Sequence, residues 1–195
     1  HGLNKPQQRQ PLQKLPQRLT AHPEGEFLLH DDTDAINQYQ VAYNLSADSW
    51  SGFFGQNNNW YSGSNNTTYY LQDNWVAATY TNSYTTLLSS WKKIKQESEK
   101  NETPEIFALA QILKISAWHK TLESFGPIPY THAGEPALVI PFDSEQVAFN
   151  AMFADLTAAI EALTVRAEQG ATIVADYDAV YGGDTRKWVK YANSL

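Results

Sequence analysis

The stretch that decides the fold is residues 103–130, TPEIFALAQILKISAWHKTLESFGPIPY. Thr103 stands in the cap position and Pro104 and Glu105 in the first turn, which is typical of the start of a helix. A glycine–proline pair at 126–127 ends it. The apolar residues between these limits recur at helical spacing, along the stripe Ile106, Ala110, Leu113, Ala117 and Leu122. We therefore predict one long amphipathic helix here.

Further helices are predicted on both sides of this one. Apolar periodicity predicts a helix at 35–45 and another at about 73–99. A capping box at 143–146, with Asp143 as the cap, predicts a helix that runs to Gly170. The last helix follows Gly182-Gly183-Asp184-Thr185 and is expected to be still running at Leu195, so we expect the natural chain to continue.

This inventory predicts an all-α fold of stacked, tetratricopeptide-like helical hairpins with a long aromatic-rich loop, because no alternating strand pattern occurs. Residues 1–25 have a proline every five to seven residues, which prevents a continuous helix. We predict an extended lead-in there and one helical domain over 26–195.

Composition excludes several classes of protein. The net charge of −7 and the acidic balance beyond residue 20 argue against nucleic-acid binding. The chain has no cysteine, and its five histidines form no pair at zinc-binding spacing. A nucleophile elbow and a phosphate-binding loop are also absent from the sequence. We predict no catalytic residue, no metal and no cofactor.

Residues 46–72 follow neither a helical nor a strand period, although they are rich in aromatic residues. Aromatic rings stack on the C–H faces of sugars, and amides and carboxylates bind sugar hydroxyls. We predict five ligand-binding residues in this loop, namely Trp60, Tyr61, Asn58, Asn59 and Asp48. The other rings are expected to anchor the loop to the helices, namely Trp50, Phe53, Phe54 and Tyr69.

Two other groups of residues have a structural and a functional interpretation. Trp91, Trp118 and Trp188 lie at the core spacing of predicted helices, so we expect all three in the core. The acids Asp176, Asp178 and Asp184 suggest a calcium loop, but their spacing does not fit an EF-hand. We expect a turn there, with Asp184 capping the following helix.

Several short motifs occur in a fixed order along residues 26–195. They are Asn44-Leu45-Ser46-Ala47-Asp48, Gly52-Phe53-Phe54-Gly55, Asn65-Asn66-Thr67-Thr68-Tyr69, Trp91-Lys92-Lys93-Ile94, Ala110-Gln111-Ile112-Leu113-Lys114, Phe125-Gly126-Pro127-Ile128-Pro129-Tyr130, Pro141-Phe142-Asp143, Tyr181-Gly182-Gly183-Asp184, Lys187-Trp188 and Tyr191-Ala192-Asn193-Ser194-Leu195. In this order and spacing the chain resembles the SusD/RagB family, most closely its SusD-like branch. It departs from the family pattern at 126–127, where Gly-Asp is common and this chain has Gly-Pro.

The resemblance implies a non-enzymatic surface lipoprotein of the bacterial outer membrane. Such proteins bind glycans or other nutrients and deliver them to a TonB-dependent (SusC-like) transporter, which they cap. Members are more than twice as long as this chain, so residues 26–195 would be the N-terminal part of the domain. Contact with the membrane would then come only through a lipid anchor upstream of this chain.

Two alternatives remain open at this point. The chain could be a protein-interaction scaffold or a peptide-capturing module that binds no glycan. It could also be a glycoside hydrolase, although that requires paired carboxylates in a cleft and the acids here stand mostly at helix starts or on predicted exposed faces.

Overall fold

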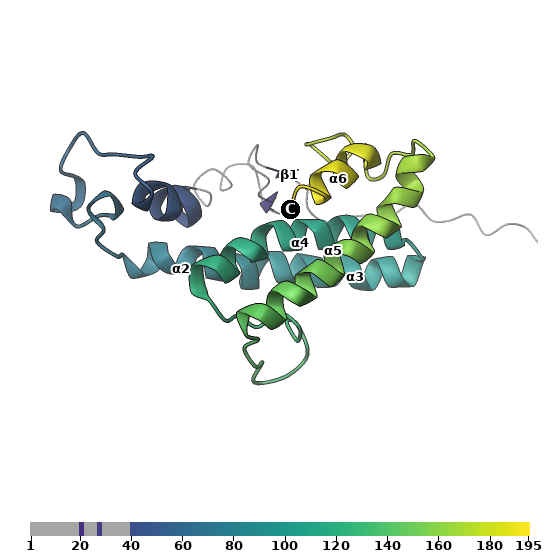
Figure 1. Cartoon of the computed structure of the whole chain (residues 1–195), viewed down its shortest axis with the longest axis horizontal. Coiled ribbons are helices and arrows are strands. Elements are labelled where there is room, and N and C mark those ends of the chain that lie inside the picture. The colour runs from purple at the N-terminus through teal and green to yellow at the C-terminus, as the bar shows by residue number, and fades with distance from the viewer. Residues whose placement is uncertain (1–19, 22–26, 29–39) are drawn as a thin grey trace, which may run out of the picture.

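Helix α4 (Pro104–Phe125) is the centre of the structure, and the long helices on either side pack against it. The structure is a computed structural model that describes residues 20–21, 27–28 and 40–195, and these residues are mostly helical (Figure 1). Buried side chains occur on every face of α4, among them Trp118 and Leu122. The predicted all-α fold and the predicted bounds of this helix are confirmed.

The chain before α4 is helical without a break from Asp73 to Asn101. Helices α2 (Asp73–Thr81) and α3 (Leu88–Asn101) are joined by the π-helical stretch η4 (Asn82–Leu87). The predicted helix at 73–99 is therefore confirmed within two residues. Glu102 then adopts a left-handed conformation with φ 54°, and the chain turns back so that α3 packs along α4.

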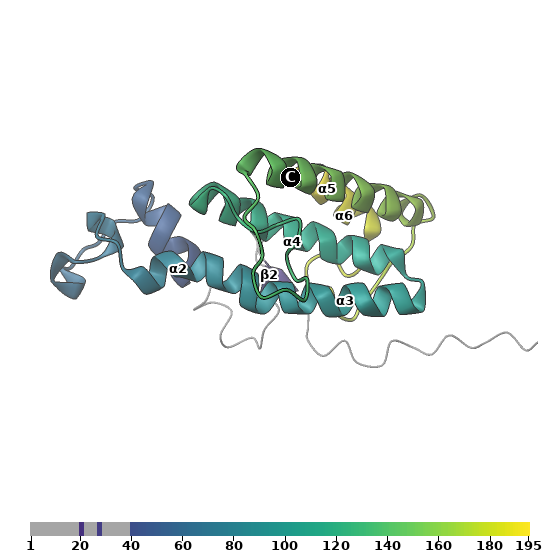
Figure 2. The same cartoon turned by 90° about the horizontal axis from the view of Figure 1, so that it is seen from below.

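Helices α5 (Glu145–Glu168) and α6 (Thr185–Ala192) complete a layered bundle. Figure 2 shows α2 and α3 on one side of α4 and α5 on the other, and α6 packs against α5. The interior between the layers is apolar. It includes Leu109, Ile112, Leu113, Met152, Leu163 and Trp188.

Helix α5 is apolar on more than one side. Its inner residues Ala148 and Met152 are buried in the bundle, whereas Val147, Phe153 and Val165 on its outer side are exposed. Of the helices that the structure describes, α5 is the one that is long and apolar enough to cross a membrane by length and composition. A helix that packs inside a helical bundle passes the same test.

Two of the predicted helix caps differ in the structure. The hydroxyl of Thr103 is buried and has no hydrogen-bond partner among the described residues, so Thr103 occupies the cap position of α4 without capping it. The N-terminus of α5 is capped by Ser144, whose Oγ accepts from the amide of Val147 at 3.3 Å. Asp143 is not the cap, because its carboxylate binds elsewhere. Asp184 caps α6 as predicted.

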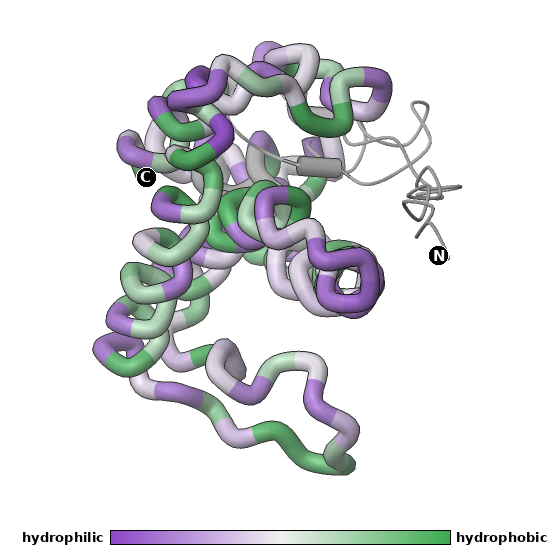
Figure 3. Tube along the Cα trace, turned by 90° about the vertical axis from the view of Figure 1, so that its right-hand side faces the viewer, coloured by the Kyte–Doolittle hydropathy of each residue, from purple (hydrophilic) through white to green (hydrophobic). Residues whose placement is uncertain are grey.

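Asp143 closes the base of the loop between α4 and α5. Its Oδ2 accepts from the amides of Tyr130 at 2.8 Å and Thr131 at 2.7 Å, and its Oδ1 accepts from the Thr131 hydroxyl. An isolated bridge pairs Ile128 with Asp143 and brings the carboxylate to these amides. The closed loop projects from the bundle, with a hydrophobic stretch at its far end (Figure 3).

The two ends of the described chain add smaller elements. Strand β1 (Thr20–Ala21) pairs antiparallel with β2 (Phe27–Leu28), and the remainder of the predicted lead-in lies outside the described residues. The predicted helix at 35–45 is described from its middle onward, as the π-helix η1 (Gln40–Asp48). Helix α6 ends at Ala192, which corrects the expectation that it is still running at Leu195. The side chains of Asn193 and Ser194 bind its last carbonyls.

Candidate functional site

Residues 40–72 form a separate lobe, which we name the aromatic lobe. It contains η1 and two 3-10 helical turns, η2 (Trp60–Gly63) and η3 (Asn66–Thr68). The lobe lies at the N-terminal end of α2, with η1 packed alongside that helix, and is away from α5 and α6 (Figure 1). It contains all five residues that the sequence predicted as ligand-binding.

Three rings of this region touch one another, and we name Trp60, Tyr61 and Trp75 the aromatic cluster. The centroid of the Trp60 ring lies 5.3 Å from that of Tyr61 and 5.4 Å from that of Trp75, and Tyr61 lies 5.5 Å from Trp75. Tyr61 is 64% exposed, and the two indoles are half-buried. The structure therefore joins the predicted pair Trp60 and Tyr61 and adds Trp75, which the sequence analysis placed in a helix without a role.

The exposed ring of Tyr61 is held out by an unusual backbone. Tyr61 has φ 50° and Ser62 has φ 52°, and Gly63 follows with φ 80°. Left-handed conformations cost a non-glycine residue roughly 1–2 kcal/mol, because its Cβ approaches the carbonyl oxygen. Such strain persists only where the surroundings determine it, and it is common at binding sites.

The side chain of Asn65 helps to hold the turn at residues 61–63 in this conformation. Its side-chain amide donates to the carbonyl oxygen of Trp60 at 2.9 Å and to Oε1 of Gln56 at 3.0 Å. Its Oδ1 accepts from the amide of Thr67 and from the Thr67 hydroxyl, so it caps η3. The sequence analysis missed this residue. The signal was an Asn-x-x-Thr capping box over residues 65–68, which a search for long helices passes over.

The structure places the three predicted polar residues differently. Asn58 and Asn59 precede Trp60 directly and are exposed, and the carbonyl of Asn59 accepts from the amide of Ser62 at 3.1 Å. Asp48 lies at the end of η1, where its Oδ2 accepts from the side-chain amide of Asn44 at 2.6 Å. The two asparagines thus share the turn of the aromatic cluster, whereas Asp48 is joined to η1.

The expectation that the remaining rings of the loop are core anchors is wrong for most of them. Phe53 is 85% exposed and Tyr69 is 69% exposed, and Phe54 is exposed as well. Trp50 is half-buried, and its carbonyl oxygen accepts from the Tyr69 hydroxyl at 3.1 Å. The short turns of the lobe bury backbone and asparagine side chains and leave these rings at the surface.

The acidic cluster before α6 is structural. The carboxylate of Asp178 accepts from the amides of Val180, Tyr181 and Gly183 and from the indole N–H of Trp188, the last at 2.6 Å. The carboxylate is buried, and these four hydrogen bonds satisfy its oxygens within the fold. In the part of the chain that the structure describes, no group of three His, Asp or Glu residues is placed to hold a metal ion.

Two of the three helix tryptophans are in the core as expected, and the third covers a buried lysine. Trp118 and Trp188 are buried, and Trp91 is half-buried. The Nζ of Lys114 lies 4.2 Å from the ring centroid of Trp91, 4.8 Å from Trp118 and 4.3 Å from Tyr130. Burial lowers the pKa of Lys114 to about 8. This group lies in the bundle and not in the lobe.

Comparisons with known proteins agree on one family. A family model described as Susd and RagB outer membrane lipoprotein matches residues 12–195. A solved chitin-binding SusD homolog from Flavobacterium johnsoniae is 33% identical, with a TM-score of 0.73 over 80% of this chain and 33% of its own. A SusD homolog from Bacteroides vulgatus is 27% identical, with a TM-score of 0.70 over 81% of this chain and 32% of its own.

A third solved structure, a SusD homolog from Bacteroides uniformis, is 35% identical, with a TM-score of 0.58 over 64% of this chain and 26% of its own. No curated protein matches the chain. The chain spans about a third of the length of the first two solved relatives.

Proposed function

Because this chain belongs to the family of Susd and RagB outer membrane lipoproteins, we propose that it binds an oligosaccharide at the surface of the outer membrane through the aromatic cluster. The observation that carries this proposal is the exposed ring of Tyr61, which makes T-shaped contacts with the rings of Trp60 and Trp75. One solved relative is described as chitin-binding, which supports a glycan as the ligand class.

The chemistry of the site is recognition without bond cleavage. An exposed ring gives the apolar C–H face of a pyranose a flat partner, and two neighbouring rings fix its orientation. The exposed amides of Asn58 and Asn59 stand beside it and can donate to and accept from sugar hydroxyls. We assign no catalytic residue and no cofactor to this site.

Delivery to a TonB-dependent transporter is the second part of the proposal, with a lipid anchor upstream of this chain. It is tested apart from glycan binding, by co-purification of the protein with a SusC-like TonB-dependent transporter from the same organism. A Trp60→Ala variant should co-purify as well as the wild type, because the aromatic lobe is assigned to the glycan. Failure of the wild-type protein to co-purify contradicts the transporter part alone.

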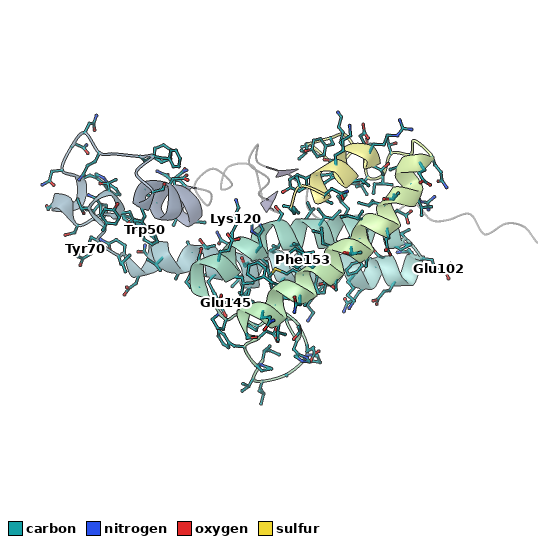
Figure 4. All side chains as sticks on the ribbon, viewed as in Figure 1. Trp50, Tyr70, Glu102, Lys120, Glu145 and Phe153 are labelled. Carbon is teal, nitrogen blue, oxygen red and sulfur yellow. The ribbon has the colours of Figure 1, made fainter. Side chains whose placement is uncertain are left out.

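Glycan binding is tested by calorimetry with four hexasaccharides, built from chitin, starch, xylan and laminarin units. Trp60→Ala should weaken the best of them by about thirtyfold, since a central tryptophan in a binding site is typically worth about 2 kcal/mol. Phe153→Ala is the matched control, because Phe153 is an exposed ring on α5, far from the lobe (Figure 4). No heat from any of the four with the wild-type chain contradicts the proposal.

A protein- or peptide-binding role is the second candidate, and the α4–α5 loop favours it. Leu138 is fully exposed and Val139 is mostly exposed in the middle of a loop with a closed base, and Phe142 is mostly exposed next to that base. Exposed apolar clusters of this kind often mark interaction surfaces. If the chain binds its transporter but no hexasaccharide, and Leu138→Ser abolishes the transporter contact, this candidate replaces the glycan proposal.

A further inference from the structure

Asn65 and Asn66 are neighbours with opposite hydrogen bonding. Both side chains are completely buried. Asn65 uses its amide fully, donating to Gln56 and Trp60 and accepting from Thr67. For Asn66, neither Nδ2 nor Oδ1 has a hydrogen-bond partner among the described residues.

An amide without partners in a protein interior needs a reason. An asparagine side chain offers two donors and two acceptor lone pairs, and burial without partners opposes folding. The backbone of Asn66 is firmly bonded, since its carbonyl accepts from the amide of Tyr69 at 3.0 Å. The unused groups are therefore confined to the side chain, in a segment that is otherwise held in place.

Asn66 lies between the strained positions of the aromatic lobe. Tyr61 and Ser62 precede it with φ 50° and 52°, and Tyr69 follows with φ 58°. The residue before it holds the carbonyl of Trp60, so η3 is tied directly to the aromatic cluster. Left-handed non-glycine residues store backbone strain, and an arrangement that relieves it becomes accessible when a ligand favours that arrangement.

A second unpaired donor lies in the same lobe. The indole N–H of Trp50 is buried and has no partner within the described ranges. Trp50 is connected to the segment after Asn66 through the bond from the Tyr69 hydroxyl to its carbonyl. Trp50 and Tyr70 are both at the lobe end of the molecule in Figure 4. The lobe therefore conceals polar groups from two segments around η3.

We propose that the side-chain amide of Asn66 is a concealed contact for sugar hydroxyls, reached when the turn at residues 61–63 rearranges around the bound oligosaccharide. The inference rests on the proposed glycan binding and deepens it. Part of the free energy of binding then comes from the Asn66 amide, which has no hydrogen-bond partner before binding and gains one in the complex. Asn66 then determines affinity without taking part in the stability of the free lobe.

The test compares Asn66→Leu with the matched control Asn65→Leu in the 195-residue chain. Leucine has nearly the shape of asparagine and removes the polar atoms. Asn66→Leu should bind the best of the four hexasaccharides about tenfold more weakly, the effect of losing a hydrogen-bonding partner for the sugar. Its midpoint in urea should equal or exceed that of the wild type, because leucine leaves no buried polar atom without a partner at this position. Asn65→Leu should lower the midpoint.

Two results overturn the inference while leaving glycan binding intact. One is a wild-type affinity in Asn66→Leu. The other is a loss of stability in Asn66→Leu as large as in Asn65→Leu, which would mean that Asn66 is a structural residue satisfied by an internal water. If the wild-type chain binds none of the four sugars, the proposed function fails instead, and this inference fails with it.

A measurement on the wild-type chain covers the case in which Asn66→Leu does not fold. The side-chain amide resonances of Asn65 and Asn66 are followed by nuclear magnetic resonance during titration with the same hexasaccharide. The Asn66 resonance should shift markedly as its amide becomes bonded, while the Asn65 resonance shifts less. An unmoved Asn66 resonance at saturation overturns the inference.

Discussion

The bundle of α2 to α6 and the aromatic lobe treat the same residue types in opposite ways. In the bundle, most buried polar side chains are paired, as in the bond of Ser83 to Thr121 and of Trp91 to Gln111, although the Thr103 hydroxyl and the Trp118 indole N–H have no partner among the described residues. In the lobe, the amide of Asn66 is buried and unpaired within the described part of the chain. The bundle also buries Trp118 and Trp188, whereas the lobe exposes most of its rings.

Backbone strain follows the same division. The described residues include five non-glycine positions with positive φ, and three of them, Tyr61, Ser62 and Tyr69, lie in the lobe, which is much the smaller part. Local stability varies within a protein, and binding segments come from its less stable part. We infer that the bundle provides most of the stability of the fold. The lobe is locally less stable, and it exposes most of its rings.

The largest expected effect tests the bundle side of this comparison. Asp178→Ala removes the acceptor for three backbone amides and for the indole N–H of Trp188, and leaves buried donors without a partner. We expect the free energy of unfolding to fall by about 4 kcal/mol, measured by urea titration.

The neighbouring acid provides the control for that prediction. Asp176 is exposed, and Asp176→Ala should change the free energy of unfolding by less than about 0.5 kcal/mol. A small loss in Asp178→Ala, equal to that in Asp176→Ala, would contradict the view that paired polar groups hold the bundle together.

The second prediction concerns the buried lysine of the bundle. Burial lowers the pKa of Lys114 to about 8, against the opposing effect of Asp155 and with a smaller lowering by Lys95. The unfolded chain keeps this proton to higher pH than the folded chain, so the free energy of unfolding should rise between about pH 8 and pH 10. Below pH 8 the whole penalty is present.

Lys114→Met isolates this effect. It removes the buried charge together with the cation–π contacts, so at pH 7 the free energy of unfolding should rise by about 2 kcal/mol. Its stability should also be flat between pH 8 and pH 10. Above pH 10 the free energy of unfolding should fall in both proteins, because burial raises the pKa values of Tyr84 and Tyr130 in the folded chain. An unchanged slope in Lys114→Met would contradict the assignment.

The sequence predicts the bundle well because the apolar residues of long helices recur at helical spacing. The bounds of α2 to α3 and of α4 follow from apolar spacing and from residues such as Pro104 and Gly126. One error arises where two side chains compete for one role. Asp143 has the chemistry of a helix cap, but the bridge to Ile128 places it at other amides, and Ser144 becomes the cap.

The lobe is harder to predict because side-chain bonds, not periodicity, fix its shape. The density of rings and asparagines predicts Trp60 and Tyr61 as ligand-binding residues, and in the structure these two rings touch. It could not reveal Trp75, which reaches them from the first turn of α2, nor the bond from Asn65 to the Trp60 carbonyl. The same composition predicts burial for Phe53 and Tyr69, because aromatic rings are ordinarily buried. Both rings are exposed, since a short turn has few neighbouring residues that could cover them.

The smallest expected effect tests the lobe side. Ser62 is exposed and left-handed, with φ 52°, so Ser62→Gly should relieve strain and raise the free energy of unfolding by about 1 kcal/mol. Ser62→Ala keeps the Cβ and should gain nothing. If the turn rearranges on binding, the same change stabilises the free form and should weaken the best hexasaccharide about fivefold. Equal stabilities of the glycine and alanine variants would show that Ser62 stores no strain, and the contrast between lobe and bundle would then lose this part of its support.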